Sequence, residues 1–320
     1  MISLSLLSKR RSSRRTRHGR SIRHWSPFFA PLVLGLVLAL DSPTQSQTPG
    51  ETLDQIAAAT RPSDRNWHAF WQHHLGEWKG RWTRYAPSGE IEDTFLSTRS
   101  FTANPTRTEV VQVNRYNYAS GRSLKKEWRY TLKDHSRADG LTHPAYAAMR
   151  GLAFNNGAAA LLIPTLQTNQ FAPFEFFLKH GDFRYSVALL YGQDGQLIRT
   201  SSIREERGQP IDALWTDNVV QMKPWHPKGV WQGSQQQINP DLTQHPVEPT
   251  NWQWRSTNQS THYFPDRIIL RCPQRFVQGQ SFSINVLWQV STKELQTISA
   301  SYNEQRQLIS VMHQSLSPDP

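Results

Sequence analysis

The sequence predicts an all-β protein made of two consecutive antiparallel barrels, the second shorter and with its closure left open. Three observations lead to this prediction. Apolar and polar residues alternate with a period of two through most of the chain after residue 76, as in half-buried strands. No sustained amphipathic helix lies between these segments, which argues against parallel βαβ folds. Two landmark motifs also recur in the same order in both halves.

Alternation and turn residues define each predicted strand. In residues 77–85, Trp78 and Trp82 share one face with Gly80, and charged residues occupy the other. The Ala- and Gly-rich stretch 144–160 fits a strand, a loop or one helical turn. The predicted strands are 77–85, 91–101, 109–118, 125–133, 174–179, 183–191 and 197–206 in the first half, and 230–238, 251–255, 266–272, 281–290, 294–303 and 307–315 in the second.

The chain is expected to contain five parts. A short helical lead-in is predicted before the first barrel, because Leu53, Ile56 and Ala57 have helical spacing. Three prolines within 207–228 would break a strand ladder and indicate a connection between domains. The predicted parts are 1–47 (signal peptide or basic extension), 48–72 (helical lead-in), 73–206 (first barrel), 207–227 (linker) and 228–317 (second barrel).

The charge is concentrated at the N-terminus. The formal net charge is +11, but eight of the 36 Lys and Arg residues lie within 1–40, which contain no acidic residue. The rest carries 28 basic and 25 acidic residues, a net charge of +3. This balance argues against nucleic-acid binding by the processed form.

The basic region precedes a thirteen-residue apolar run at 28–40, the layout of an export signal. A helix of that length spans about 20 Å, less than the roughly 30 Å of a bilayer core. We therefore expect export to a periplasm or thylakoid lumen, with no stable membrane anchor after processing. The alternative is a basic extension upstream of the true start, which would leave the protein in the cytoplasm.

An internal repeat is indicated by two pairs of motifs. The segment 76–80 (GEWKG) corresponds to 229–233 (GVWQG), and 191–198 corresponds to 302–309. The spacing between the motifs is 42 residues shorter in the second half. The order of the motifs predicts a duplication, with shorter loops and fewer or shorter strands in the second copy.

The G-x-W at the start of each half resembles the lipocalin, or calycin, signature. Together with the segments 73–78, 85–90, 139–150, 203–206 and 263–273, it resembles a two-barrel family of cyanobacteria and plastids that is catalogued as a domain of unknown function. The resemblance covers about residues 66–317. It implies two lipocalin-like barrels, and it implies no specific activity.

A structural role at the barrel base is expected for five residues. In small barrels of this type the G-x-W tryptophan plugs the closed end, and an arginine from the last strand can stack on it. Trp78 with Arg204 is the predicted pair of the first barrel. Trp231 is expected to do the same in the second barrel without an evident arginine, and Gly76 and Gly229 begin the two motifs.

The candidate ligand-binding residues lie on strands that otherwise point apolar groups inward. Arg99 shares its strand face with Phe95 and Phe101, and an inward arginine could hold a carboxylate. Glu175 and Arg184 also interrupt apolar strands, and Trp128 and Tyr130 supply aromatic lining. The alternative is a solvated outer face, or a structural ion pair of an arginine with Glu175 or Glu205.

The sequence predicts no catalytic residue, metal site or cofactor. Adjacent histidines such as His73 and His74 point apart, and no carboxylate completes a metal-ligand spacing. The one cysteine, Cys272, excludes an intramolecular disulfide and is expected to be a packed thiol.

Two classes of function fit this pattern. The first is binding or carriage of a small hydrophobic molecule such as a fatty acid, pigment or isoprenoid, because an aromatic-lined barrel is a concave apolar site. The second is a chromophore-lyase-like or ligand-modifying factor that positions such a molecule for a partner's thiol. A third interpretation is a barrel filled by its own side chains that acts as an interaction scaffold. The sequence does not identify a protein partner.

Overall fold

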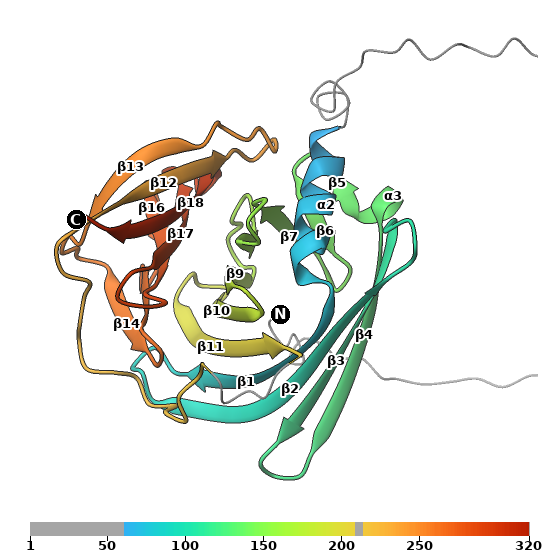
Figure 1. The fold of residues 1–320 in the computed structure, drawn as a ribbon, viewed down its shortest axis with the longest axis horizontal. Helices are drawn as coiled ribbons and strands as arrows, with labels where there is room; N and C mark the ends of the chain where they lie inside the picture. The colour runs from blue at the N-terminus through green and yellow to red at the C-terminus, as the bar shows by residue number, and fades with distance from the viewer. Residues whose placement is uncertain (1–60, 209–213, 320) are drawn as a thin grey trace, which may run out of the picture. The chain divides into compact units, whose positions relative to one another are not determined.

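The structure is a computed structural model that describes residues 61–208 and 214–319. The chain is all-β, as predicted, and its strands form two antiparallel sheets that each curl back on themselves (Figure 1). None of the described helices is long and apolar enough to cross a bilayer. The predicted signal over 1–47 lies outside the described residues and stays a prediction.

The first sheet has eleven strands in the order β4-β3-β2-β1-β11-β10-β9-β8-β7-β6-β5. Its two edge strands, β4 and β5, are consecutive in the chain and are separated by one short helix, so the sheet forms a nearly closed barrel. The strands are β1 (Gly76–Tyr85), β2 (Ile91–Ala103), β3 (Glu109–Tyr118), β4 (Ser123–Thr131), β5 (Ser136–Arg137), β6 (Gly140–His143), β7 (Tyr146–Ala153), β8 (Ala159–Leu162), β9 (Ala172–His180), β10 (Phe183–Tyr191) and β11 (Leu197–Arg207), and the short helix is α3 (Leu132–His135).

The second sheet repeats this arrangement with seven strands, in the order β13-β12-β18-β17-β16-β15-β14. Its edge strands are again consecutive, and β12, like β1, lies between the second and the last strand of its sheet. The inward tryptophans of the two motifs therefore occupy equivalent strands. The strands are β12 (Val230–Ile238), β13 (Glu248–Gln253), β14 (Ser260–Phe264), β15 (Ile268–Cys272), β16 (Phe282–Trp288), β17 (Leu295–Tyr302) and β18 (Leu308–Pro318).

Helix α2 (Pro62–His74) packs against β5, β6 and β7 beside the gap in the first barrel (Figure 1). Pro62 occupies the first turn, where its missing N–H costs nothing. Trp71 reaches interior side chains of the barrel, with its ring 5.8 Å from Phe101 and 4.9 Å from Tyr130. The helix thus closes the side of the barrel that the sheet leaves open.

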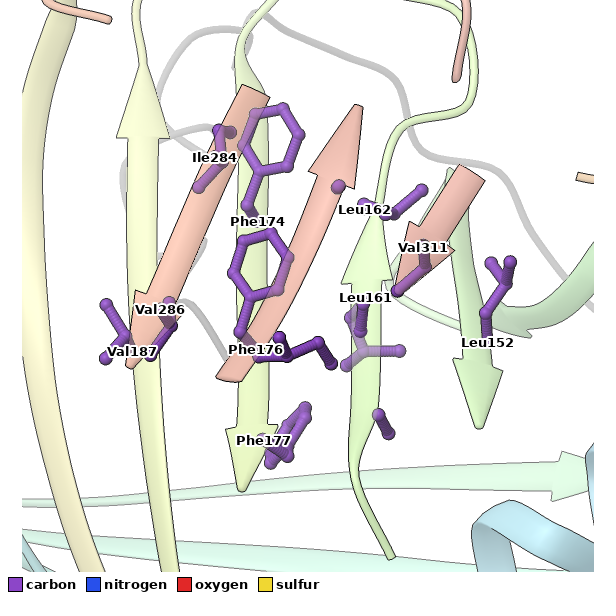
Figure 2. Close-up of a cluster of buried hydrophobic side chains, with 14 of the residues drawn as sticks. Leu152, Leu161, Leu162, Phe174, Phe176, Phe177, Val187, Ile284, Val286 and Val311 are labelled. Atoms are coloured by element: carbon purple, nitrogen blue, oxygen red, sulfur yellow. The ribbon is translucent and has the colours of Figure 1, made fainter. Parts of the chain in front are cut away.

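The two barrels pack together through their outer faces. Phe174 and Phe176 of β9 lie against Ile284 and Val286 of β16 in one buried cluster (Figure 2). Hydrogen bonds cross this interface too, including one from the Tyr302 hydroxyl to the Ile163 carbonyl at 2.9 Å. Since outer faces make this core, the two interiors remain separate.

Some local predictions were wrong. The predicted strand 266–272 begins with a turn, because Asp266 and Arg267 both have positive φ, and the missed strand β14 precedes it. The predicted strand 125–133 ends at Thr131, whose hydroxyl accepts a hydrogen bond from the Asp134 N–H and caps α3. The ambiguous stretch 144–160 contains β7 and the start of β8.

The barrel interface contains a histidine that should make stability depend on pH. Burial lowers the pKa of His313 to about 4, from 6.5, and its ring lies 3.0 Å from the Asn156 amide nitrogen. Below pH 6.5 this histidine is protonated in the unfolded chain, whereas in the folded chain it stays neutral until the pH falls to about 4. Stability from this group is therefore full above pH 6.5 and falls as the pH decreases.

We expect His313→Gln to reduce the loss of unfolding free energy between pH 7 and pH 4.5 by about 2–3 kcal/mol. Urea denaturation of the native chain and the variant at both pH values measures this. An unchanged pH dependence would show that this histidine is not protected from protonation in the folded state.

Candidate functional site

Strand register brings four charged side chains together inside the first barrel. Arg99 of β2 lies opposite Trp78 of β1, and Arg184 of β10 lies opposite Glu205 of β11. Glu175 of β9 lies on the same face, opposite Ala188. We call Arg99, Glu175, Arg184 and Glu205 the charge cluster; all four are at most 1% exposed.

The members of the charge cluster bind one another. The Arg99 guanidinium donates to both carboxylate oxygens of Glu205, and its Nη1 donates to Glu175 Oε1 at 3.1 Å. Arg184 Nε donates to Glu205 Oε2 at 2.8 Å. The hydroxyl of Ser186 donates to Glu175 Oε1 at 3.1 Å. Glu205 is therefore shared by two arginines.

The electrostatics agree with a set of internal ion pairs. Burial and the neighbouring Arg99 lower the pKa of Arg184 to about 10, against the opposing effect of Glu205. Burial alone would raise the pKa of Glu205, but Arg184 and Arg99 outweigh it and hold the carboxyl below its usual value. Both arginines thus face carboxylates of the chain itself. Their predicted ligand role stays a prediction, and these pairs compete with it.

The two aromatic candidates lie on the inner face of β4, toward helix α2. Tyr130 is buried, and its hydroxyl donates to Gln112 Oε1 at 2.9 Å. Trp128 is partly buried, and its ring centroid lies 5.5 Å from that of His143. Both side chains therefore line the interior of the first barrel.

The base of the first barrel differs from the prediction in one residue. Trp78 is buried, and its nearest cation–π partner is Arg184, with the guanidinium 4.2 Å from the ring centroid, while that of Arg207 on the last strand lies 5.3 Å away. Arg204 was the wrong choice, because it alternates with the inward Ile203 and Glu205 and points outward. Its Nη1 donates to Asp266 Oδ2 at 2.7 Å, across the interface between the barrels.

The base of the second barrel follows the prediction more closely. Trp231 is buried with the interior cluster of its own barrel, and its indole donates to the Lys228 carbonyl at 3.2 Å. Gly76 is the first residue of β1 and Gly229 directly precedes β12, with φ of 103° and 78°, values that glycine adopts without strain. Each motif thus begins with a backbone turn that directs its tryptophan inward.

The second barrel contains a cavity of about 270 Å³, which we call the second-barrel cavity. Its apolar part belongs to the interior cluster that also contains Trp231. The remaining wall is mostly polar, and one side chain in it is charged. The residues that define the cavity are Trp252, Trp254, Ile269, Leu287, Ser299 and Arg271.

Register explains this lining. On β15 and β16, Ile269 lies opposite Leu287, and Arg271 lies opposite Asn285. On the next strand, Thr297 donates to Gln314 Oε1 at 2.8 Å. The apolar side chains Ile269 and Leu287 form the floor of the cavity. Polar side chains two residues away along the same strands form its wall.

Sequence reasoning missed Arg271, Trp252 and Trp254. The signal was present, since Arg271 shares its strand face with Ile269 just as Arg99 shares its own with Phe101. Cys272, the next residue, points to the other face, and burial raises the pKa of its thiol to about 12. Within the part of the chain that the structure describes, no three His, Cys, Asp or Glu side chains form a metal-binding group.

A larger hollow of about 400 Å³ lies among turns of both barrels, around residues 166–170, 192–195 and 275–278. Most of its lining residues are exposed on turns, as Asn169 and Asp194 are. The second-barrel cavity differs in that most of its wall is formed by strands of one sheet, β13 and β15 to β18. We therefore take the second-barrel cavity as the candidate site.

Two consecutive antiparallel barrels, each with an inward tryptophan on its first strand, define a tandem calycin-like protein. Residues 63–210 match a family described as a domain of unknown function (DUF3598), N-terminal. The predicted resemblance is thus confirmed.

A solved protein of unknown function from the DUF3598 family of Nostoc punctiforme is similar, with 16% identity and a TM-score of 0.59; the match covers 79% of this chain and 99% of that chain. The S-type phycobiliprotein lyase CPES from Guillardia theta is similar at 10% identity and a TM-score of 0.32, over 50% of this chain and 99% of that one. No curated protein matches the sequence.

Proposed function

We propose that this protein binds and carries a small, partly apolar organic molecule in the second-barrel cavity. The observation that supports this most is the combination of an apolar floor with a polar wall inside one barrel. Ligand sites of proteins have this composition, in which apolar surface supplies affinity and a few polar groups fix orientation. The flat rings of Trp252 and Trp254 favour packing against an acyl chain or a ring of the ligand.

The size of the cavity narrows the predicted ligand classes. A volume of about 270 Å³ equals the space of roughly nine water molecules at about 30 Å³ each. It suits a short acyl chain or a single ring system of about ten non-hydrogen atoms. Among the fatty acids, pigments and isoprenoids considered, a molecule with a short acyl chain therefore fits best.

The first barrel supports the scaffold alternative for its own half. Its interior holds the charge cluster, and beyond it a ring cluster in which Trp82, Phe95 and Tyr116 are each at most 2% exposed. Side chains of the chain itself occupy these positions. A lyase-like role would need a partner's thiol, since Cys272 lies buried on the far face of its sheet.

Filling the cavity should abolish binding. We expect Ser299→Phe, at a position in the cavity wall, to weaken binding of octan-1-ol by at least tenfold, because the new ring occupies the ligand's volume. Tryptophan fluorescence of the full chain, titrated with octan-1-ol, measures this through Trp252 and Trp254. Ser317→Phe, at an exposed position of the neighbouring strand β18, is the matched control and should bind normally.

The proposal would be overturned by a chain that shows no saturable response to octan-1-ol or octanoate and whose organic extract after purification contains no bound molecule. Equal binding by the native chain and Ser299→Phe would place any ligand outside the second-barrel cavity.

A further inference from the structure

Arg271 is the one charged side chain in the lining of the second-barrel cavity. It lies next to the last residue of β15, opposite Thr261 on one neighbouring strand and Asn285 on the other. Asp and Glu are missing from the lining. The cavity wall therefore has a fixed positive charge with no built-in counter-charge.

The contacts of Arg271 leave its hydrogen-bonding groups available. Its guanidinium lies over the Trp254 ring, 3.5 Å from the centroid, and such stacking leaves the edge of the group free. The buried Nε has no hydrogen-bond partner. Burial is the main influence on the pKa of Arg271 and lowers it, with Tyr263 as the opposing neighbour.

The fully buried arginines of the first barrel each pair with a carboxylate. Arg99 and Arg184 share Glu205, and Arg204 holds Asp266. Among the residues described, no carboxylate lies within ion-pair distance of Arg271. Arg271 therefore has no counter-charge within the described chain, and the open space beside it is the second-barrel cavity.

We propose that the ligand of this cavity is a small amphipathic carboxylate, whose head pairs with Arg271 and whose apolar body lies against Trp252, Ile269 and Leu287. This inference rests on the proposed function and adds the charge of the ligand. A guanidinium edge matches a carboxylate in two parallel hydrogen bonds. The neighbouring Asn285 amide donates to Ser283 at 2.9 Å, so the polar wall beside the head is already ordered.

The test compares two probes of equal chain length, octanoate and octan-1-ol, by fluorescence titration of the full chain at pH 7. We expect octanoate to bind at least tenfold more tightly than octan-1-ol. Arg271→Gln should weaken octanoate binding by at least tenfold and leave octan-1-ol within twofold, which also shows that the variant is folded. The octanoate affinity of Arg271→Lys should lie between those of the native chain and Arg271→Gln, because lysine keeps the positive charge but lacks the paired N–H donors of the guanidinium.

Arg255→Gln is the matched control, because Arg255 is exposed and adjoins Trp254 in the sequence. It removes the same charge and should change neither affinity. Equal affinity of the native chain for the two probes would overturn the carboxylate inference and leave the proposed function standing. Tight octanoate binding by Arg271→Gln would also overturn it, whereas a native chain that binds neither probe and yields no extracted molecule would overturn the proposed function itself.

Discussion

Replacing Glu205 with alanine is expected to destabilise the folded protein by about 3–5 kcal/mol, because it leaves two buried arginines without their shared carboxylate. Arg99 pairs with both oxygens of Glu205, and Arg184 donates to one of them at 2.8 Å. All three side chains are at most 1% exposed. Water cannot replace the lost carboxylate there without opening the barrel.

Guanidinium denaturation of the native chain and Glu205→Ala measures this effect. The control is Glu109→Ala, which removes an exposed ion pair with Arg129 between β3 and β4 and should cost no more than about 1 kcal/mol. A Glu205→Ala variant no less stable than Glu109→Ala would show that the charge cluster contributes little to the fold. The Arg99 ligand hypothesis would then regain support.

Alternation in the sequence predicted the faces of strands well and their partners poorly. It correctly placed Arg99 on the inner face, with Phe95 and Phe101. It could not choose among the possible partners of Arg99, because the pairing order of strands far apart in the chain decides which carboxylates come near. Glu175 and Glu205 are 76 and 106 residues away from Arg99.

Arg204 also shows that contacts between strands depend on a register that the sequence pattern does not give. The position of an arginine in the last strand suggested a contact with Trp78, yet a shift of one residue along a strand moves a side chain to the opposite face. The register of β1 with β11 places Arg204 opposite Arg81, whereas Trp78 lies opposite Arg207. The arginine nearest to the Trp78 ring, Arg184, comes from β10, which is separated from β1 by β11 in the sheet.

The second-barrel cavity depends on a residue outside the strands, whose position the alternation of apolar and polar residues cannot predict. Its wall joins β15, β16 and β17 to the segment that follows β13, where Trp254 lies. Trp254 lies outside any strand, so no period predicts its direction. Trp254 lies in the connection between the edge strands β13 and β14, and there its ring lies against the Arg271 guanidinium.

Adding a methyl group to the second glycine of each repeated motif, by substitution with alanine, should lower the stability of the fold strongly. A Cβ on Gly233 would lie 2.1 Å from the Ser315 carbonyl oxygen and 3.0 Å from the Leu316 Cα. Both are backbone atoms of β18, so the strand pair must separate to make room. We expect Gly233→Ala to destabilise the protein by about 3 kcal/mol, at the upper end for overpacking.

Gly80 occupies the equivalent position in the first barrel, and its added Cβ would lie 2.7 Å from the Arg204 carbonyl oxygen. Gly80→Ala should therefore be destabilising as well. Gly121→Ala is the control: nothing lies within 4 Å of its added Cβ, and its φ of 79° alone should cost about 1–2 kcal/mol.

Urea midpoints of the three variants measure the order of these effects. In both barrels the first strand must approach the last one closely, two residues after the inward tryptophan, to close the base around that indole. A Gly233→Ala variant as stable as Gly121→Ala would mean that β12 and β18 do not approach so closely. The equivalence of the two motifs, on which the tandem-barrel architecture depends, would then fail at its second copy.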